Sequence, residues 1–574
     1  MVPSSTRPAT QAETTWVGLF AVLVGIAWLI PDHYLPWTAF HSDLAAALGL
    51  GAMVVGVLRW RLYRWRLSPA AWATFLLALV PVAQVLTGHI HFAGDGWMAA
   101  LYLTGFGLAV AAGQQAQAHD SKSIEPLIWV MVVAGLVSAG LAAAQWLRVD
   151  SSGVPMMRLV QGARPYANLG QPNQLATILM LALVSAVLLY QWRRLGTGAL
   201  AGLLAVLLLG VALTGSRTGW IEMVGMTVWV LAFRNRSGLR LTRAGMAALA
   251  MTLMVMVAVL PLLSEWLLVA GPHTVQVRPV GARPIHWAAI VDAISREPWF
   301  GYGWNQVSVA VSRVALDHPA PHEMIEHSHN LVLDLMVWNG VPLALVVVLC
   351  IGAWIWHHGV RSRDATSTLL VAMVGVTLVH AMFEFPLEYA YLLLPVGFII
   401  GVLEAIRPLG PTLAVPRWAM AGVAVVASAM TAWVALEYLE VEEASRALRF
   451  QAAGIGPPDV STQTANLRLL TQQQAYLQFA RTQARRGMHD DELGEMQRVS
   501  ERFGHAPVLF RFALANALNG RPLDAANALD RLCRLQSPER CHEAKENWRL
   551  TADSKYPEIR SVAGTPAPYD ASMR

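Results

Sequence analysis

Four histidines lie close together and are the first candidates for chemistry: His318, His322, His327 and His329 fall within twelve positions. Such a group invites a zinc-binding interpretation. The metalloprotease pattern H-E-x-x-H places two histidines one helical turn apart, whereas His322-Glu323 is followed by His327 five positions later. This spacing argues against a shared helix face, so we expect no metal site. A neutral imidazole here is better suited to act as a general base.

Two arginines stand in segments that also contain glycine. Arg217 lies in Gly215-Ser-Arg-Thr-Gly219, which joins two hydrophobic segments with almost no loop. An arginine near membrane depth needs an anionic partner, and its planar fork suits two-point contact with a phosphate or carboxylate. The alternative is an arginine that extends to lipid headgroups. Arg283 lies in Val280-Gly-Ala-Arg-Pro-Ile-His-Trp287, at the start of the polar segment that ends with the histidines.

A third polar segment runs from Gly162 to Gln174, at the mouth of a hydrophobic segment. It contains five side chains that could contact a substrate: Arg164, Asn168, Gln171, Asn173 and Gln174. Hydrocarbon tolerates irregular polar backbone only where it lines a cavity, so we predict a substrate pocket here. The alternative is a polar helix start with Asn173 as the N-cap.

Arginines and a histidine around one pocket suit a substrate with a diphosphate group and an attacking hydroxyl. The arginines would stabilise the departing diphosphate in place of a metal ion, and the histidine would take the hydroxyl proton. The outward loops contain no D-x-D pair, and the chain has no G-x-S-x-G elbow and no nucleotide-binding glycine loop. The sequence therefore implies no cofactor.

The composition shows what kind of protein must position these residues. Of the 574 residues, 55% are hydrophobic and only 14% are charged, and the mean hydropathy is +0.44. Soluble globular proteins carry about 25% charged residues, so this chain is a polytopic membrane protein. Its net charge of +5 indicates cytoplasmic loops that meet anionic lipid, and no nucleic-acid partner is expected.

A membrane helix needs about 20 mostly apolar residues. Thirteen segments qualify: Trp16–Ile30, Leu44–Leu58, Ala70–Leu86, Trp97–Gly113, Pro126–Leu147, Gln174–Gln191, Ala199–Leu213, Gly219–Phe233, Ala244–Leu268, Leu331–Trp356, Ser367–Phe383, Tyr389–Ile406 and Trp418–Tyr438. The fold class is thus all-α, a polytopic membrane protein with about 13 transmembrane helices. We expect N-terminal membrane helices over residues 1–147 and a membrane core over 148–438 that contains a large outward loop at 269–330.

Arginine clusters set the orientation. They follow the second, sixth, eighth and tenth segments, and all fall on one side if the N-terminus is cytoplasmic. Thirteen spans then place residues 439–574 outside, in the periplasm of a Gram-negative cell. This tail is polar with helical periodicity around residues 513–529, which is typical of a tetratricopeptide-like (TPR-like) hairpin or of a plain helical bundle.

The tail contains Cys533 and Cys541, eight residues apart. Disulfides form in an oxidising compartment, so we predict that the two are bonded across the turn at Gln536-Ser-Pro-Glu539. The alternative is a pair of unbonded small apolar residues.

In order along the chain, these motifs resemble the O-antigen ligase and polymerase superfamily. Four motifs of this chain resemble the shared core of that superfamily: Gly215-Ser-Arg-Thr-Gly219, Gly281-Ala-Arg283 with Trp287, Gly301-Tyr-Gly303, and His329-Asn330. The segments Arg164–Gln174 and Phe383–Tyr389 look more specifically like the bacterial O-linked protein oligosaccharyltransferases of the PglL type. The resemblance implies that His329 is the essential histidine and that Arg217 and Arg283 contact the diphosphate.

The resemblance further implies a glycosyltransferase of the bacterial inner membrane, active on the periplasmic face. It would move a glycan en bloc from undecaprenyl diphosphate to serine or threonine of exported proteins such as pilin, without metal and with inversion. The alternative within the family is an O-antigen ligase that acts on lipid A-core. A lipid-glycan transporter should show mid-span charges and two related halves, which are not evident, and an assembly platform would not need all three site residues.

Overall fold

The computed structural model describes residues 11–60, 64–150, 152–160, 162–267, 269, 283–455 and 466–562. Gly281 and Ala282 of the predicted arginine motif lie outside these residues, as do most of positions 268–282 of the predicted outward loop.

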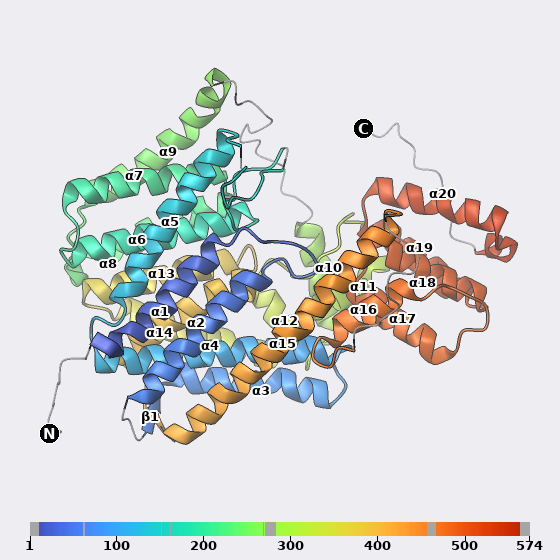
Figure 1. Cartoon of the computed structure of the whole chain (residues 1–574), viewed down its shortest axis with the longest axis horizontal. Helices are drawn as coiled ribbons and strands as arrows, with labels where there is room; N and C mark the ends of the chain where they lie inside the picture. Colours follow the sequence, from blue (N-terminus) through green and yellow to red (C-terminus); the bar gives the residue numbers. More distant parts are fainter. Residues whose placement is uncertain are drawn as a thin grey trace. The chain divides into compact units, whose positions relative to one another are not determined.

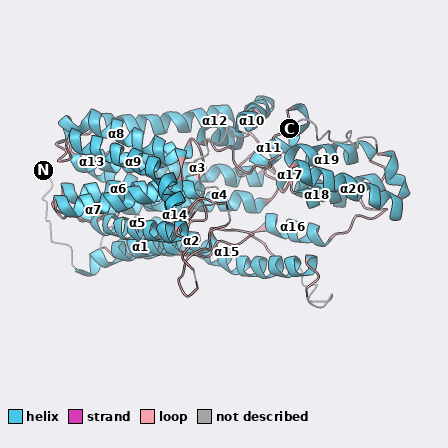
Figure 2. Cartoon of the chain, turned by 90° about the horizontal axis from the view of Figure 1, so that it is seen from above, coloured by secondary structure: helices cyan, strands magenta, loops and turns pink. Residues whose placement is uncertain are grey.

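Nearly all the regular secondary structure of the described chain is helical, which confirms the predicted all-α class (Figure 2). The membrane part contains α1 Gln11–Leu29, α2 Phe40–Arg59, α3 Pro69–Leu86, α4 Ala93–His119, α5 Glu125–Trp146, α6 Pro172–Gln191, α7 Thr197–Thr214, α8 Arg217–Ser237, α9 Arg243–Trp266, α12 Leu331–Ile355, α13 Ala365–Ala381, α14 Ala390–Ile406 and α15 Arg417–Ala452. Between α9 and α12 lie α10 Arg283–Arg296 and α11 Val307–Val314.

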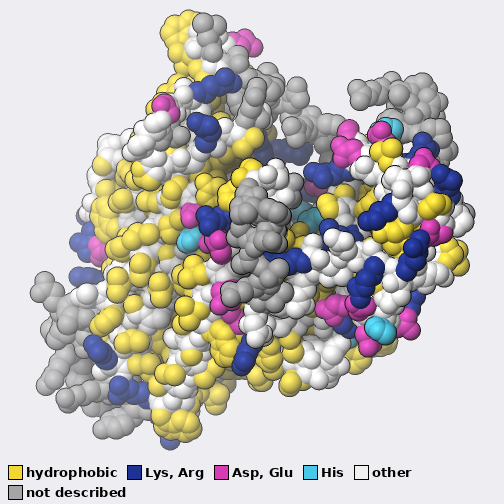
Figure 3. Space-filling model, turned by 45° about the vertical axis from the view of Figure 1, so that its right-hand side comes forward, with side chains coloured by type: hydrophobic (Ala, Val, Ile, Leu, Met, Phe, Trp, Pro, Cys, Tyr) yellow, Lys and Arg dark blue, Asp and Glu magenta, His cyan; other side chains and the backbone are white. Residues whose placement is uncertain are grey.

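Each of the thirteen predicted spans coincides with one of these helices over its described residues. Nine of the described helices are long and apolar enough to cross a membrane, namely α2 to α7, α9, α12 and α15, and α1, α13 and α14 are shorter apolar helices. The remaining segment forms α8, which carries charged residues at both ends. Hydrophobic side chains form broad areas of the surface, as expected where helices face lipid (Figure 3).

The chain divides into two compact units. The first contains Met1–Ala78, Leu101–Val277 and Leu349–Ala432, and the second contains Leu79–Ala100, Arg278–Val348 and Trp433–Arg574.

In the first unit, α6 is the central helix. It is buried from Gln174 to Leu189, and α5, α7, α8 and α13 pack around it (Figure 1). A helix that is apolar on all sides is stable only when neighbours or lipid cover every side. The polar segment before α6 and the turn before α8 are therefore held at one end of a rigid bundle.

Two short strands were not predicted. β1 (Arg64–Leu67) and β2 (Leu413–Pro416) pair antiparallel, with Arg64 opposite Pro416. β1 alternates exposed arginines with buried Trp65 and Leu67, but its four residues are too few to predict a strand, and β2 shows no such alternation.

The tail of the second unit forms a stack of short helices. They are α16 Thr471–Arg481, α17 Asp490–Arg502, α18 Ala506–Leu518, α19 Pro522–Leu535 and α20 Pro538–Ser554. The antiparallel pair of α18 and α19 forms the hairpin expected at residues 513–529. Cys533 and Cys541 are bonded between α19 and α20, with Cα atoms 4.6 Å apart, which confirms the predicted disulfide.

Candidate functional site

Arg217 begins α8 directly after a tight turn. Gly215 ends α7 in the left-handed conformation (φ 55°), and the Ser216 side chain caps α8 by accepting a hydrogen bond from the Gly219 amide. A Cβ atom on Gly219 would lie 2.9 Å from that of Ala176, so this glycine lets α8 pack closely on α6. The turn leaves the Arg217 side chain exposed at the helix N-terminus, where the helix dipole also favours an anion.

The predicted polar segment and the Arg217 turn meet at Glu384, in the Phe383–Tyr389 motif. Asn173 donates a hydrogen bond to the Glu384 carboxylate over 2.9 Å, and Gln171 donates one over 3.4 Å. Ser216 in turn donates to the Asn173 side-chain oxygen over 2.7 Å. Three motifs far apart in the sequence thus form one polar cluster. The helix cap is Gln171, not Asn173, so the alternative of Asn173 as the N-cap is wrong.

Arg164 and Asn168 shape the same segment through backbone contacts. The Arg164 guanidinium donates to the Gly215 carbonyl over 2.7 Å. Asn168 is 1% exposed; its amide donates to Leu29 and Pro155 carbonyls, and its oxygen accepts from the Met157 amide. Asn168 therefore fixes the loop, and its predicted role as a substrate contact stays a prediction.

A second polar group lies deeper between the same helices. The Thr177 hydroxyl lies 2.6 Å from a Glu222 carboxylate oxygen and 2.8 Å from Nδ1 of His380, and all three side chains are buried. Ionisable groups inside a membrane bundle are costly and often functional. This group was not predictable from the sequence, because each residue stands alone in an apolar stretch.

The histidine segment belongs to the second unit and is irregular from residue 318 to the start of α12. His329 has a left-handed backbone (φ 56°) one residue before Asn330, and the Asn330 side chain accepts the first amides of α12. Asp334 accepts the Ser328 amide over 2.8 Å. These bonds hold His329 at the mouth of α12, as its position in the sequence predicted.

Helix α10, which begins with Arg283, contacts the histidine segment next to His329. Trp287 donates its indole N–H to the Ser328 carbonyl over 2.9 Å, and Arg283 lies one helical turn earlier, on the same helix face. His286 is buried on this helix and interacts electrostatically with His329.

Sequence analysis did not single out His286. Burial lowers the pKa of its imidazole, although Glu323 at 3.7 Å acts in the opposite direction. A neutral His286 adds no positive charge beside His329.

The C-terminal helices support the histidine segment within the second unit. Arg502 of α17, only 11% exposed, pairs with Asp95 over 3.0 Å and with Glu326 over 3.3 Å. The Arg534 carbonyl accepts the His322 amide over 2.9 Å. The tail thus fixes the loop at His322 and at Glu326, both on the N-terminal side of His327.

The predicted site residues are divided between the two units. Arg164, Asn168, Gln171, Asn173 and Arg217 belong to the first unit, and Arg283 and His329 belong to the second. No three histidine, cysteine or acidic side chains in the described parts of the chain are grouped so as to hold a metal ion.

Three regions of the chain match known protein families. Residues 201–348 match the O-Antigen ligase family, and residues 165–190 match the Protein glycosylation ligase family. Residues 368–547 match the family described as "Virulence factor membrane-bound polymerase, C-terminal". These regions include the Glu384 cluster, Arg217, Arg283, His329 and much of the tail.

Two proteins of Acinetobacter baylyi are similar over most of their length. The chain is 28% identical over 449 residues to a general O-oligosaccharyltransferase. The aligned region covers 76% of this chain and 78% of that protein. It is 25% identical over 387 residues to a ComP-specific O-oligosaccharyltransferase, covering 66% and 69%. The chain is therefore similar to PglL-type O-oligosaccharyltransferases of the O-antigen ligase superfamily, and it is a membrane glycosyltransferase.

Proposed function

We propose that this protein transfers a glycan en bloc from undecaprenyl diphosphate to serine or threonine hydroxyls of exported proteins such as pilin. The observation that carries the proposal is the similarity to the general O-oligosaccharyltransferase over 449 residues. That protein's name describes an O-linked transfer, and the aligned length is large enough to include both polar clusters.

The proposed reaction relies on one histidine and two arginines. The acceptor hydroxyl oxygen attacks the anomeric carbon of the first sugar, and the bond from that carbon to the diphosphate oxygen breaks with inversion. His329 takes the hydroxyl proton. Arg217 and Arg283 stabilise the negative charge left on undecaprenyl diphosphate. These two arginines take the place of a metal ion.

The roles of the polar side chains follow from their contacts. Glu384 holds the amides of Gln171 and Asn173, and Asn173 accepts from Ser216, the residue before Arg217. We propose that this cluster binds the first sugar or the diphosphate and fixes the direction of Arg217. Pre-organised donors of this kind stabilise developing charge without reorganisation.

The proposed location is the inner membrane, with both clusters on the periplasmic side. The arginine-rich connections after α2, α6, α8 and α12 support this orientation. The bonded Cys533–Cys541 pair supports an oxidising compartment for the tail.

The decisive experiment is co-expression with a candidate pilin and a pathway that makes a lipid-linked glycan, followed by intact-mass measurement of the pilin. A mass increase equal to the glycan supports the proposal. The match of residues 201–348 to the O-Antigen ligase family favours one competitor, ligation to lipid A-core. Modified lipopolysaccharide with unmodified pilin would establish that competitor instead.

A further inference from the structure

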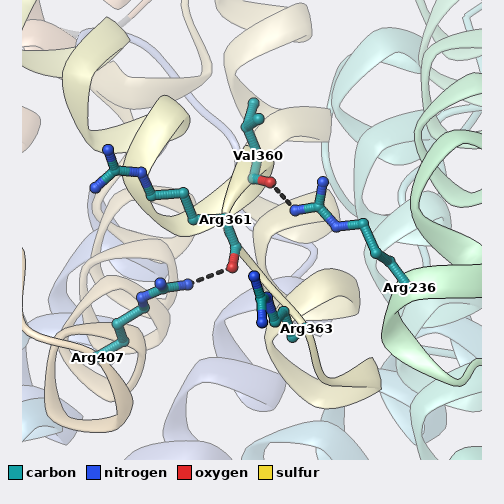
Figure 4. A pocket seen from close by; sticks show the side chains of 5 residues that line it. All are labelled: Arg236, Val360, Arg361, Arg363 and Arg407. Atoms are coloured by element: carbon teal, nitrogen blue, oxygen red, sulfur yellow. Dashed lines mark hydrogen bonds between the residues drawn. The ribbon is translucent and has the colours of Figure 1, made fainter.

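Four arginines line a cavity of the first unit that the proposed reaction does not use. The cavity has a volume of about 690 Å³ and is lined by Arg236, Val360, Arg361, Arg363 and Arg407 (Figure 4). Arg236 ends α8, whereas Arg217 begins it, so about 30 Å of helix separates the cavity from the Arg217 turn. We refer to it as the arginine pocket.

Helix C-termini explain part of this arrangement. Arg236 donates to the Val360 carbonyl and Arg407 donates to the Arg361 carbonyl, as arginines often do where helices end. These contacts leave most of the five N–H donors of each guanidinium free to face the pocket. The structure shows no side-chain hydrogen bond from Arg361 or Arg363 to another described residue.

The pocket is strongly positive. None of the four guanidinium groups forms an ion pair in the described part of the chain. Asp364, the nearest acid in the sequence, accepts the Ser367 amide over 2.7 Å as the cap of α13. Four like charges around a cavity repel one another unless an anion lies between them, and arginine forks suit phosphate oxygens.

We propose that the arginine pocket binds the phosphate groups of an anionic phospholipid headgroup, at the membrane surface opposite the Arg217 turn. Apolar surface beside the pocket favours a lipid over a soluble phosphate compound. Ile406, directly before Arg407, is 40% exposed, and Trp356, at the start of the turn that ends at Val360, is 59% exposed. Basic pockets between membrane helices on the cytoplasmic side are known to suit headgroups with several phosphates.

The test measures binding of cardiolipin, which carries two phosphates, to the full-length protein in detergent by native mass spectrometry. Arg361→Gln/Arg363→Gln removes two charges and no hydrogen bond seen in the structure. Each arginine near a membrane surface contributes about 1 kcal/mol, so the dissociation constant should rise about 30-fold. Arg363→Gln alone should raise the dissociation constant about fivefold. This single variant tests the site if the double variant does not fold.

The matched control is Arg243→Gln, an exposed arginine at the same end of the bundle but outside the pocket; its binding should be unchanged. Wild-type affinity in the double variant, or an equal loss in Arg243→Gln, would overturn the site. Inorganic pyrophosphate that displaces cardiolipin at similar concentration would show that a soluble phosphate compound is the occupant.

A different observation in the second unit supports a separate inference about the turn Pro298-Trp-Phe-Gly301. Trp299 and Phe300 are 72% and 77% exposed, yet the backbone of the turn is fixed against α12. The Tyr302 amide donates to the Val337 carbonyl over 2.6 Å, and the Val341 amide donates to the Pro298 carbonyl over 2.8 Å.

Two glycines allow this turn to lie close against α12. Gly301 and Gly340 both have positive φ, and a Cβ atom on Gly340 would lie 2.3 Å from the Trp299 carbonyl oxygen. Gly340 also interrupts α12. The 20 residues from 341 to 360 that follow are apolar except for His357 and His358 near their end. As a helix they span about 30 Å, the thickness of the hydrocarbon core.

The neighbouring helix α3 places the membrane boundary at the same level as the break in α12. Its apolar segment ends at Leu86, and Gln84 lies beside the break in α12, since it donates to the Trp338 carbonyl over 2.8 Å. Tryptophan is enriched at this boundary because its ring is both apolar and polar. We infer that Trp299 and Phe300 insert into the outer headgroup layer and hold α10, with Arg283, at a fixed height.

The test places a single cysteine at position 299 or 300 in a Cys350→Ala background, labels it with a fluorophore and reconstitutes the protein in vesicles. A lipid quencher with its label near the headgroups should reduce the emission several-fold more than aqueous iodide does. Leu523→Cys is the control, because Leu523 is 79% exposed but lies in the tail helix α19; iodide should quench it and the lipid quencher should not. A probe at 299 or 300 that behaves like the one at 523 would overturn the inference.

Discussion

His329 tests the proposed chemistry most directly. It has a left-handed backbone (φ 56°), which asparagine tolerates better than most residues, so His329→Asn removes the base with little backbone strain. Positioned proton transfer contributes about 10²–10⁴-fold. We expect transfer to fall at least about 100-fold, measured by intact mass of the acceptor, while lipid-linked glycan still binds.

His322 provides the matched control for this change. It also has a left-handed backbone (φ 55°) and is exposed in the same segment, so His322→Asn should remain close to wild type. A metal site would require both histidines equally and would lose activity with a chelator. Full transfer by a correctly inserted His329→Asn protein would contradict the base assignment.

Arg217→Lys tests the two-point contact with the diphosphate. Lysine keeps the charge but not the planar fork, and loss of one pre-organised donor to a developing anion costs about 10²–10³-fold. We expect at least about a tenfold loss, mainly in kcat, because the contact strengthens as the diphosphate leaves.

The control for Arg217→Lys is Arg243→Lys. Arg243 also begins a helix, follows a Thr242 cap and stands two residues before a glycine that donates to that cap. Its substitution should leave kcat and KM unchanged. Equal effects of the two substitutions would mean that Arg217 acts through helix stability and not through the diphosphate.

Single residues were predictable where a motif surrounded them. Arg217, Arg283 and His329 lie in short patterns with glycine or asparagine. Arg217 and Arg283 each begin a helix, and His329 lies two residues before one. His286 and Thr177 could not be predicted as site neighbours, because their contacts come from helices that are distant in sequence. Glu384 was visible only as part of the Phe383–Tyr389 motif.

At the scale of elements, α17 and the histidine segment are coupled through Arg502. Arg502→Ala would leave Asp95 (3% exposed) without its cation, and breaking a buried pair costs about 3–5 kcal/mol. We expect a lower unfolding temperature and faster hydrogen exchange at residues 321–330. Arg498→Ala, which removes an exposed pair with Glu495 in the same helix, should change stability by less than about 0.5 kcal/mol.

The same segment should make the second unit sensitive to acid. Burial lowers the pKa of His327 to about 4; Glu326 acts in the opposite direction, and Arg502 and His329 act in the same direction as burial. Above pH 6.5 the imidazole is neutral in both the folded and the unfolded chain. As the pH falls from 6.5 towards 4, only the unfolded chain gains the proton, so stability is lost by up to about 1.4 kcal/mol per pH unit.

The pH dependence can be measured as the unfolding temperature of the wild type and of His327→Gln between pH 7 and 4. The variant should lose less stability over this interval, because it has no imidazole to protonate. Parallel curves for the two proteins would contradict this account of His327.

Element boundaries show what periodicity can and cannot predict. The thirteen apolar segments were predictable because hydrocarbon imposes both length and composition. The break of α12 at Gly340 was not, because it depends on the backbone of the Trp299 turn against which it packs. The β1–β2 pair depends in the same way on a partner almost 350 residues away.

At the scale of the whole molecule, the proposal requires the tail and the arginine pocket to face opposite compartments. Cys533 and Cys541 are bonded and Cys350 lies in α12, so a Cys350→Ala background suits cysteine labelling. Leu523→Cys should react with an impermeant maleimide on whole cells with a permeable outer membrane. Arg243→Cys should react only after the inner membrane is opened, because an odd number of spans separates the two positions. Labelling of Arg243→Cys but not Leu523→Cys would invert the topology. It would place the Arg217 turn in the cytoplasm, where exported acceptors are not presented in their final form.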